Sequence, residues 1–160
     1  MVIKKNIFFL IILILFLSCS SNQNIPIKKN IEFNTISFEV VEKKIIIKSE
    51  LPLNTNRLIN EWFEKNVKVN GFEGLLIFQI DSYKEALIDI PNGKRVDISM
   101  TFSVVINKPA LSQKHFIEGN VDVFGEISGN FSLDDLDNMI LNTQFDLIYL
   151  LSQDLQSKIS

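Results

Sequence analysis

The sequence has a single cysteine, Cys19, and a single histidine, His115, and this scarcity excludes several kinds of chemistry. One cysteine cannot form a disulfide within the chain, so stability must come from packing. A transition-metal site needs several His or Cys ligands, so none is expected. A Ser-His-Asp triad would have to use His115, and no G-x-S-x-G elbow is present to hold the serine. We interpret His115 as a surface residue between a loop and a strand.

Glycine and basic residues are also scarce, which argues against binding of nucleotides and nucleic acids. The stretch from Gly71 to Gly74 is too short for a phosphate-binding loop and opens a strand instead of a helix. Lys4 and Lys5 lie in a segment that is expected to be removed, as described below. Without them, 14 of the 16 Lys and Arg residues remain against 19 Asp and Glu, a net charge of −5. The sequence therefore predicts no nucleic-acid partner and no cofactor.

The first 18 residues have the order of regions that is typical of a secretory signal peptide. Lys4 and Lys5 give a positive start, an unbroken apolar run extends from Ile7 to Leu17, and the small Ser18 follows. As a helix, that run would span roughly 16 Å, about half of the ~30 Å that a bilayer core requires. An uncleaved transmembrane helix is therefore the weaker alternative to an exported and cleaved chain.

The cysteine directly after Ser18 resembles the one in the lipobox of bacterial lipoproteins. The resemblance implies cleavage before Cys19 and attachment of lipid, such as palmitate, to its sulfur. Ser20 and Ser21 follow without an aspartate, which by resemblance to the sorting rule of some bacteria favours the periplasmic side of the outer membrane over the inner membrane. We thus expect a signal peptide over 1–18, a lipidated polar tether over 19–30, and a single domain over 31–160.

Alternating apolar and polar residues predict several strands. The first region, Ile31 to Ser49, is either one long bent strand or a hairpin, and the pattern leaves both open. Three further strands are expected over 75–90, 96–106 and 117–127. In the last of these, Gly119 and Gly125 suggest bulges or the close approach of a helix.

Two segments have apolar residues at helical spacing. The first covers 56–69, with Asn54, Thr55 or Asn56 as its N-cap, Trp62 on its core face, and Asn70-Gly71 as a left-handed stop. The second covers 133–158, with Ser132 as its N-cap and Asp135 completing a capping box. Its apolar stripe, from Leu133 to Ile159, is expected to cover the sheet. The order of elements predicts an α+β fold, a two-layer sandwich in which an antiparallel meander sheet carries both helices on one face (β-α-β-β-β-α).

Five carboxylates fall on the predicted strands: Asp81, Asp89, Asp97, Glu118 and Asp122. A pair of carboxylates can hydrolyse a glycosidic bond. The simpler interpretation is that these residues mark the solvent-exposed face of the sheet, and we expect no catalytic residue and no enzyme.

The helix Asn60-Glu61-Trp62-Phe63-Glu64-Lys65, followed by Gly71, Gly74 and a strand through Asp81, resembles uncharacterised alphaproteobacterial lipoproteins. The order of elements also resembles the LPS-assembly lipoprotein and the auxiliary lipoproteins of ABC-type lipid transporters. These resemblances imply a non-enzymatic envelope lipoprotein that assists assembly or transport as a partner of a β-barrel or transporter. The alternative is a periplasmic module that binds a lipid or another apolar ligand.

Overall fold

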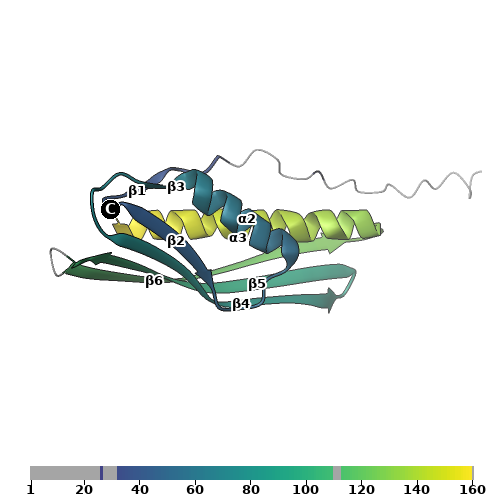
Figure 1. Cartoon of the computed structure of the whole chain (residues 1–160). Helices are drawn as coiled ribbons and strands as arrows, with labels where there is room; N and C mark the ends of the chain where they lie inside the picture. The colour runs from purple at the N-terminus through teal and green to yellow at the C-terminus, as the bar shows by residue number, and fades with distance from the viewer. Residues whose placement is uncertain (1–25, 27–31, 110–112, 160) are drawn as a thin grey trace, which may run out of the picture.

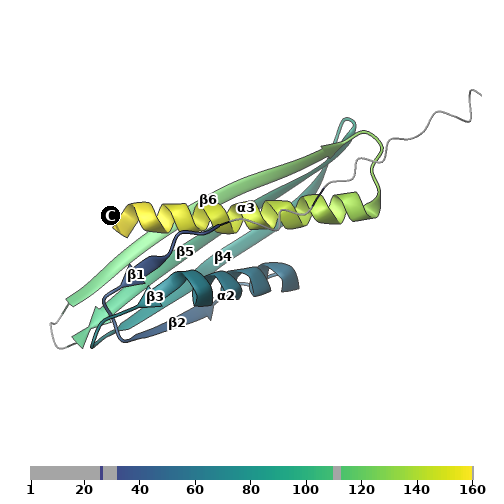
Figure 2. The same ribbon diagram turned by 90° about the horizontal axis from the view of Figure 1, so that it is seen from above.

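The computed structural model describes Pro26, residues 32–109 and residues 113–159. A four-stranded sheet forms one layer, and both long helices lie on one of its faces (Figure 1). A small parallel pair of strands, β1 and β3, lies beside the helices (Figure 2). The elements in chain order are β1 (Ile36–Phe38), β2 (Glu42–Ile47), α2 (Leu53–Asn66), β3 (Val67–Val69), β4 (Leu75–Ile90), β5 (Gly93–Lys108), β6 (Gln113–Ser128) and α3 (Leu133–Ile159).

The α+β class and the two-layer arrangement agree with the expectation from the sequence. The strand order is β2-β4-β5-β6, and the last three strands form the expected antiparallel meander. β2 adds to β4 in parallel, because α2 carries the chain back across the sheet between them. The region 31–49 is neither a bent strand nor a hairpin, because β1 and β2 belong to different sheets. The expected signal peptide and Cys19 lie outside the described residues.

The two ends of α2 differ from the prediction. The helix begins at Leu53, and no side chain of Asn54, Thr55 or Asn56 caps it; the preceding Pro52 makes no side-chain cap bond. It ends at Asn66, because Val67–Val69 pair in parallel with β1 instead of continuing the helix. The predicted left-handed stop at Asn70-Gly71 is therefore wrong. Positive φ angles occur at Gly74 and Gly129 and not at Gly71.

A tertiary contact closes the C-terminal end of α2. Lys43 of β2 donates from Nζ to the carbonyl oxygens of Phe63, Glu64 and Val67 at 3.0, 3.2 and 2.9 Å. The Phe63 carbonyl also accepts the backbone N–H of Val67, but the carbonyls at the end of a helix generally lack backbone donors, so a cation is well placed there. The helix therefore ends where β2 supplies this cation.

The start of α3 is as predicted. The Ser132 Oγ accepts a hydrogen bond from the Asp135 backbone N–H at 3.1 Å, and Asp135 Oδ2 accepts one from the Ser132 backbone N–H at 2.9 Å. This is the capping box, and it satisfies two backbone donors that a helix start leaves free. The middle of the apolar stripe is buried, but its ends are not: Leu133 is 79% exposed and Ile159 37%.

The core lies between the sheet and the helices. Phe78 of β4 is in contact with Trp62, Phe63 and Phe102, with ring centroids 5.5, 5.8 and 5.6 Å away. Trp62 is 2% exposed, so it is a core residue as expected. At Gly125 of β6, a Cβ atom would lie 2.0 Å from Thr143 Oγ1 of α3, which confirms the close helix approach. The β5–β6 register shows no bulge. No helix in the described ranges is long and apolar enough to cross a membrane.

Candidate functional surface

The outer face of the sheet, which neither helix covers, carries four of the five strand carboxylates. The inward-pointing residues of β5, from Val96 to Val104, are buried, whereas Asp97, Ser99 and Thr101 between them are partly exposed. By register, Ser99 pairs with Asp122 of β6, and Ser103 pairs with Glu118. The expectation that the strand carboxylates lie on the solvent-exposed face of the sheet is therefore confirmed for Asp81, Asp97, Glu118 and Asp122.

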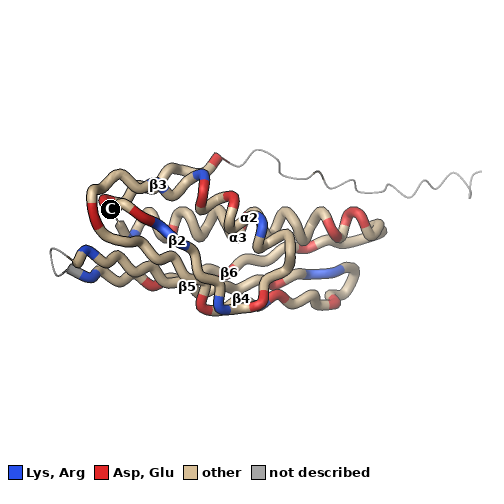
Figure 3. The backbone as a smooth tube through the Cα atoms, viewed as in Figure 1, with Lys and Arg blue, Asp and Glu red and all other residues tan. Residues whose placement is uncertain are grey.

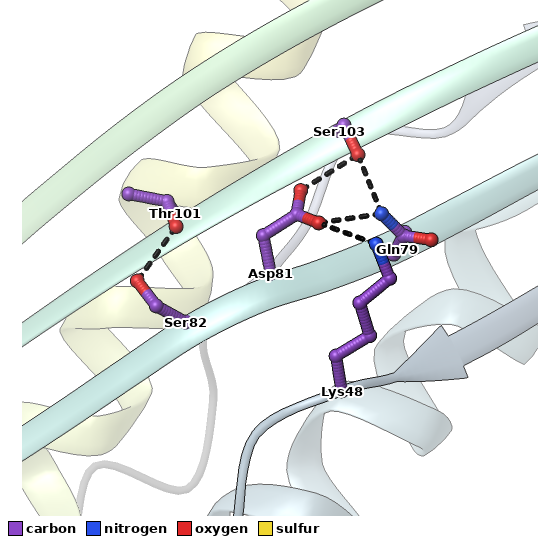
Figure 4. Close-up of polar contacts among 6 residues, drawn as sticks. All are labelled: Lys48, Gln79, Asp81, Ser82, Thr101 and Ser103. Carbon is purple, nitrogen blue, oxygen red and sulfur yellow. Dashed lines mark hydrogen bonds and ion pairs between the residues drawn. The ribbon is translucent and has the colours of Figure 1, made fainter.

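Asp81 stands at a register shift between Ile80 and Ser82 and links β4 to β5 and to Lys48, the residue that follows β2 (Figure 4). Its carboxylate accepts hydrogen bonds from Ser103 Oγ at 2.7 Å and Gln79 Nε2 at 2.5 Å, and Lys48 Nζ is 3.2 Å away. Partial burial raises the pKa of Asp81, but the three hydrogen bonds and the charge of Lys48 outweigh it, so the pKa lies below its usual value. A carboxylate held ionised in this way is a structural link and a poor proton donor.

Asp97 and Asp122 line the same hollow of about 340 Å³, together with Lys84, Arg95 and Phe124. Arg95 Nε donates to Asp97 Oδ1 at 2.6 Å, and its guanidinium lies 4.4 Å from the centre of the Phe124 ring. The hydrogen bond and charge of Asp97 raise the pKa of Arg95 further. Asp97 is thus paired with a cation, and the hollow presents charges of both signs beside an aromatic ring. Figure 3 marks where the acidic and basic residues fall along the backbone.

The other sequence candidates are dispersed. Asp89 forms an ion pair with Lys94 next to the β4–β5 turn. Glu118 is exposed and lines a second hollow of about 490 Å³ with Asp81 and Asn120. His115 is exposed on β6, as expected. Within the described ranges, no three His, Cys, Asp or Glu side chains gather in a group that could hold a metal ion.

A polar cluster on the helix-facing side of the sheet was not predicted from the sequence. The bulge at Asp81 shifts β4 by one residue, so Tyr83 points inward and pairs with Met100. Its hydroxyl donates to Glu85, which also accepts a bond from Gln144 Nε2 of α3 at 3.1 Å. Burial, followed by the hydrogen bond to Glu85, raises the pKa of Tyr83. The spacing of three residues between Ile80 and Tyr83 breaks strict alternation, and it was the feature of the sequence that could have indicated the bulge.

A groove of about 200 Å³ lies between the two helices and includes Phe33, Trp62, Asn66 and Phe145 in its lining. Trp62 Nε1 and Asn66 Oδ1 are buried there without a hydrogen-bond partner among the described residues. Asn66 Nδ2 donates to the Phe33 carbonyl at 3.0 Å, which fixes the chain across the groove. Buried polar groups are almost always paired, so an unpaired donor and an unpaired acceptor in the wall of one groove are unusual.

No family model matches the chain, and no curated protein matches it at a significant level. Solved structures resemble its fold distantly. A minor lipoprotein from Acinetobacter baumannii is 11% identical with a TM-score of 0.45, over 75% of this chain and 92% of its own. Rare lipoprotein B from Shewanella oneidensis is 14% identical with a TM-score of 0.42, over 74% and 94%. A homolog of a neuraminyllactose-binding hemagglutinin from Helicobacter pylori is 9% identical with a TM-score of 0.34, over 79% and 91%.

Two of these three structures are of lipoproteins, the general class that the sequence resemblance implied. At TM-scores below 0.5 the likeness assigns nothing further.

Proposed function

We propose that this chain is a lipoprotein of the cell envelope, anchored by lipid on Cys19, whose domain acts without catalysis as an accessory partner in assembly or transport. The main support for this proposal is the outer face of the sheet, which neither helix covers. It is polar and hollowed, and it exposes 58% of Phe116 and 61% of Phe124. Exposed aromatic residues beside Arg are typical of protein interfaces.

The proposed location is the periplasmic side of the outer membrane. It is supported by the apolar run before Cys19 and by Ser20 and Ser21 after it. Mass spectrometry of the protein extracted from membranes tests the anchor: the mature chain should begin at Cys19 with added lipid mass. A mature chain that begins elsewhere, or that partitions as a soluble protein, would contradict it. Membrane fractionation separates the outer from the inner membrane.

The absence of catalysis is supported by how the carboxylates are used. Asp81 is held ionised by three donors, and Asp97 is paired with Arg95. The competing hypothesis is a hydrolase that uses Asp97 and Asp122. It predicts that Asp97→Asn with Asp122→Asn abolishes a cellular phenotype while partner binding and folding are unchanged.

Cross-linking and purification of the full chain from membranes is the central experiment. Our proposal predicts a stoichiometric membrane protein, a β-barrel or a transporter, that co-purifies with the chain. Purification of the chain alone and without ligand would leave the proposal unsupported.

A second candidate function is the binding of an apolar ligand. It is favoured by the groove between the helices, where Trp62 Nε1 and Asn66 Oδ1 lack described partners. A ligand with an apolar body and a hydroxyl or amide group would satisfy both atoms. Native mass spectrometry of the purified chain should then show a bound small molecule, and Asn66→Leu should abolish that extra mass.

A further inference from the structure

We propose that the free edge of β6 accepts an extended, cationic segment of a partner protein as a fifth strand of the sheet. This inference rests on the proposed accessory role and names the chemistry of the partner. β6 lies at one margin of the sheet, and β2 lies at the other (Figure 2). All 16 residues of β6 pair with β5, and no described strand pairs with its other side. Its outer backbone groups are therefore available for pairing.

The two margins of the sheet differ in how they are protected. β2 has six residues and includes Lys44, which is exposed; short length and lysine are common ways to block a strand edge. β6 has no proline and no bulge, and its one lysine, Lys114, lies next to its start. Such a long, regular edge is a template for β-strand addition.

The negative charge of β6 favours a positively charged partner strand. Its acidic residues are Glu118, Asp122 and Glu126, which recur every fourth position and therefore lie on the outer face. Phe116 and Phe124 share that face and are largely exposed. A partner strand with Lys or Arg at alternate positions would place cations opposite these carboxylates and its aliphatic stems beside the rings.

The same charges disfavour a second copy of this chain. Antiparallel pairing of two β6 edges centred on Asn120 overlaps them almost completely. It also places Glu118 of each copy opposite Asp122 of the other, and like charges in that position destabilise a sheet. The row of carboxylates therefore acts against self-association as well as for a basic partner.

Inside the sheet, β6 is held in place. A Cβ atom at Gly119 would lie 2.2 Å from Phe102 Cζ, and one at Gly125 would lie 2.0 Å from Thr143 Oγ1. These close contacts fix β6 against β5 and α3, so its edge is formed before a partner arrives. Such preorganisation lowers the cost of binding.

The test uses the full chain in detergent and a fluorescent synthetic peptide in which Lys alternates with Val. We expect the peptide to bind and to slow hydrogen exchange of β6 amides. A copy of the peptide with N-methylated backbone amides keeps the charges but loses the donors, and it should bind at least about tenfold more weakly. Equal binding of both peptides would mean charge attraction without strand addition and would overturn the inference.

Two charge-reversed variants, one on β6 and one elsewhere, test whether the peptide binds at β6. Glu118→Lys with Asp122→Lys should weaken binding of the basic peptide by about tenfold or more, because two opposed charge pairs become repulsive. Glu32→Lys with Glu50→Lys changes the net charge equally at exposed positions outside β6 and should leave binding unchanged. Equal losses in both variants, or a dimer that protects β6 in the absence of peptide, would contradict the inference.

Membrane purification of the same variants separates this inference from the proposed function. A partner that is lost only with the β6 variant supports both. A partner retained by the β6 variant leaves the accessory role standing and refutes the edge as its site, whereas the absence of any partner refutes the accessory role itself.

Discussion

The two helices cover the same sheet, but their ends are determined in different ways. α3 begins at a capping box formed by Ser132 and Asp135, residues of its own sequence. α2 ends where Lys43, from a strand 20 residues before Phe63, reaches its last carbonyls. The difference explains why one boundary could be predicted and the other could not. A local cap is visible in the sequence, whereas a cap supplied by a neighbouring strand is visible only after folding.

The largest effect should come from the packed centre of α3. Leu151 is fully buried between the helix and the sheet, so Leu151→Ala should lower the free energy of unfolding by about 2–5 kcal/mol. Urea denaturation monitored by circular dichroism measures this change. Leu150→Ala, at a 38% exposed neighbour, is the control. An effect near zero at Leu151 would mean that the stripe does not pack as described.

Removal of the tertiary cap of α2 should have the next largest effect. Lys43→Met keeps the length of the stem near the Phe63 ring but removes three charged hydrogen bonds, and it should cost roughly 1.5–3 kcal/mol. Lys44→Met, one residue along the same strand and exposed, should cost little. Equal effects of the two substitutions in denaturation experiments would refute a specific cap.

Removal of the local cap of α3 should have a smaller effect. Ser132→Ala should cost ~1 kcal/mol, because the Asp135 N–H loses its acceptor. Asn54→Ala in α2 tests the contrast, since this exposed residue makes no side-chain cap bond at that helix start, and we expect no capping loss there. If Asn54→Ala costs as much as Ser132→Ala, the difference between the two helix starts is not real.

The smallest effect concerns the outer face of the sheet. The folded-state pKa of Asp81 lies below its usual value, so its ionised form stabilises the fold at neutral pH, and this stabilisation is lost as the pH falls through the folded-state pKa. Asp81→Asn should therefore cost less than about 1 kcal/mol at pH 7, since the group is partly exposed. The difference from the parent chain should shrink toward pH 3 in urea titrations, and a difference that grows on acidification would refute the assignment.

Local patterns predicted much of this fold. Alternation located β4, β5 and β6, and helical spacing placed Trp62 and Leu151 in the core. The parallel addition of β2 and the β1–β3 pair depend on contacts between distant segments, which no local pattern records. The polar cluster around Tyr83 was missed for a related reason, because a single bulge at Asp81 reverses the phase of every later residue in β4.

The carboxylates were placed correctly on the outer face, except Asp89. The register shift at Asp81 puts Asp89 on the opposite face of β4, where it pairs with Lys94 near the turn. The sequence could not reveal which of them share a hollow, since Asp97 and Asp122 meet only through the β5–β6 register. The unpaired Trp62 Nε1 was equally hidden, because an orphaned donor is a property of packing and not of residue type.

One small contact near the N-terminus bears on the proposed lipid anchor. Asn142 Nδ2 of α3 donates to the Pro26 carbonyl at 3.0 Å, so Pro26 lies against the helical layer. The stretch from Cys19 to Pro26 reaches at most about 25 Å when fully extended. If Cys19 carries a lipid as we propose, the domain is attached on its helical layer within that distance of the bilayer, and the uncovered face of the sheet lies on the opposite side of the domain.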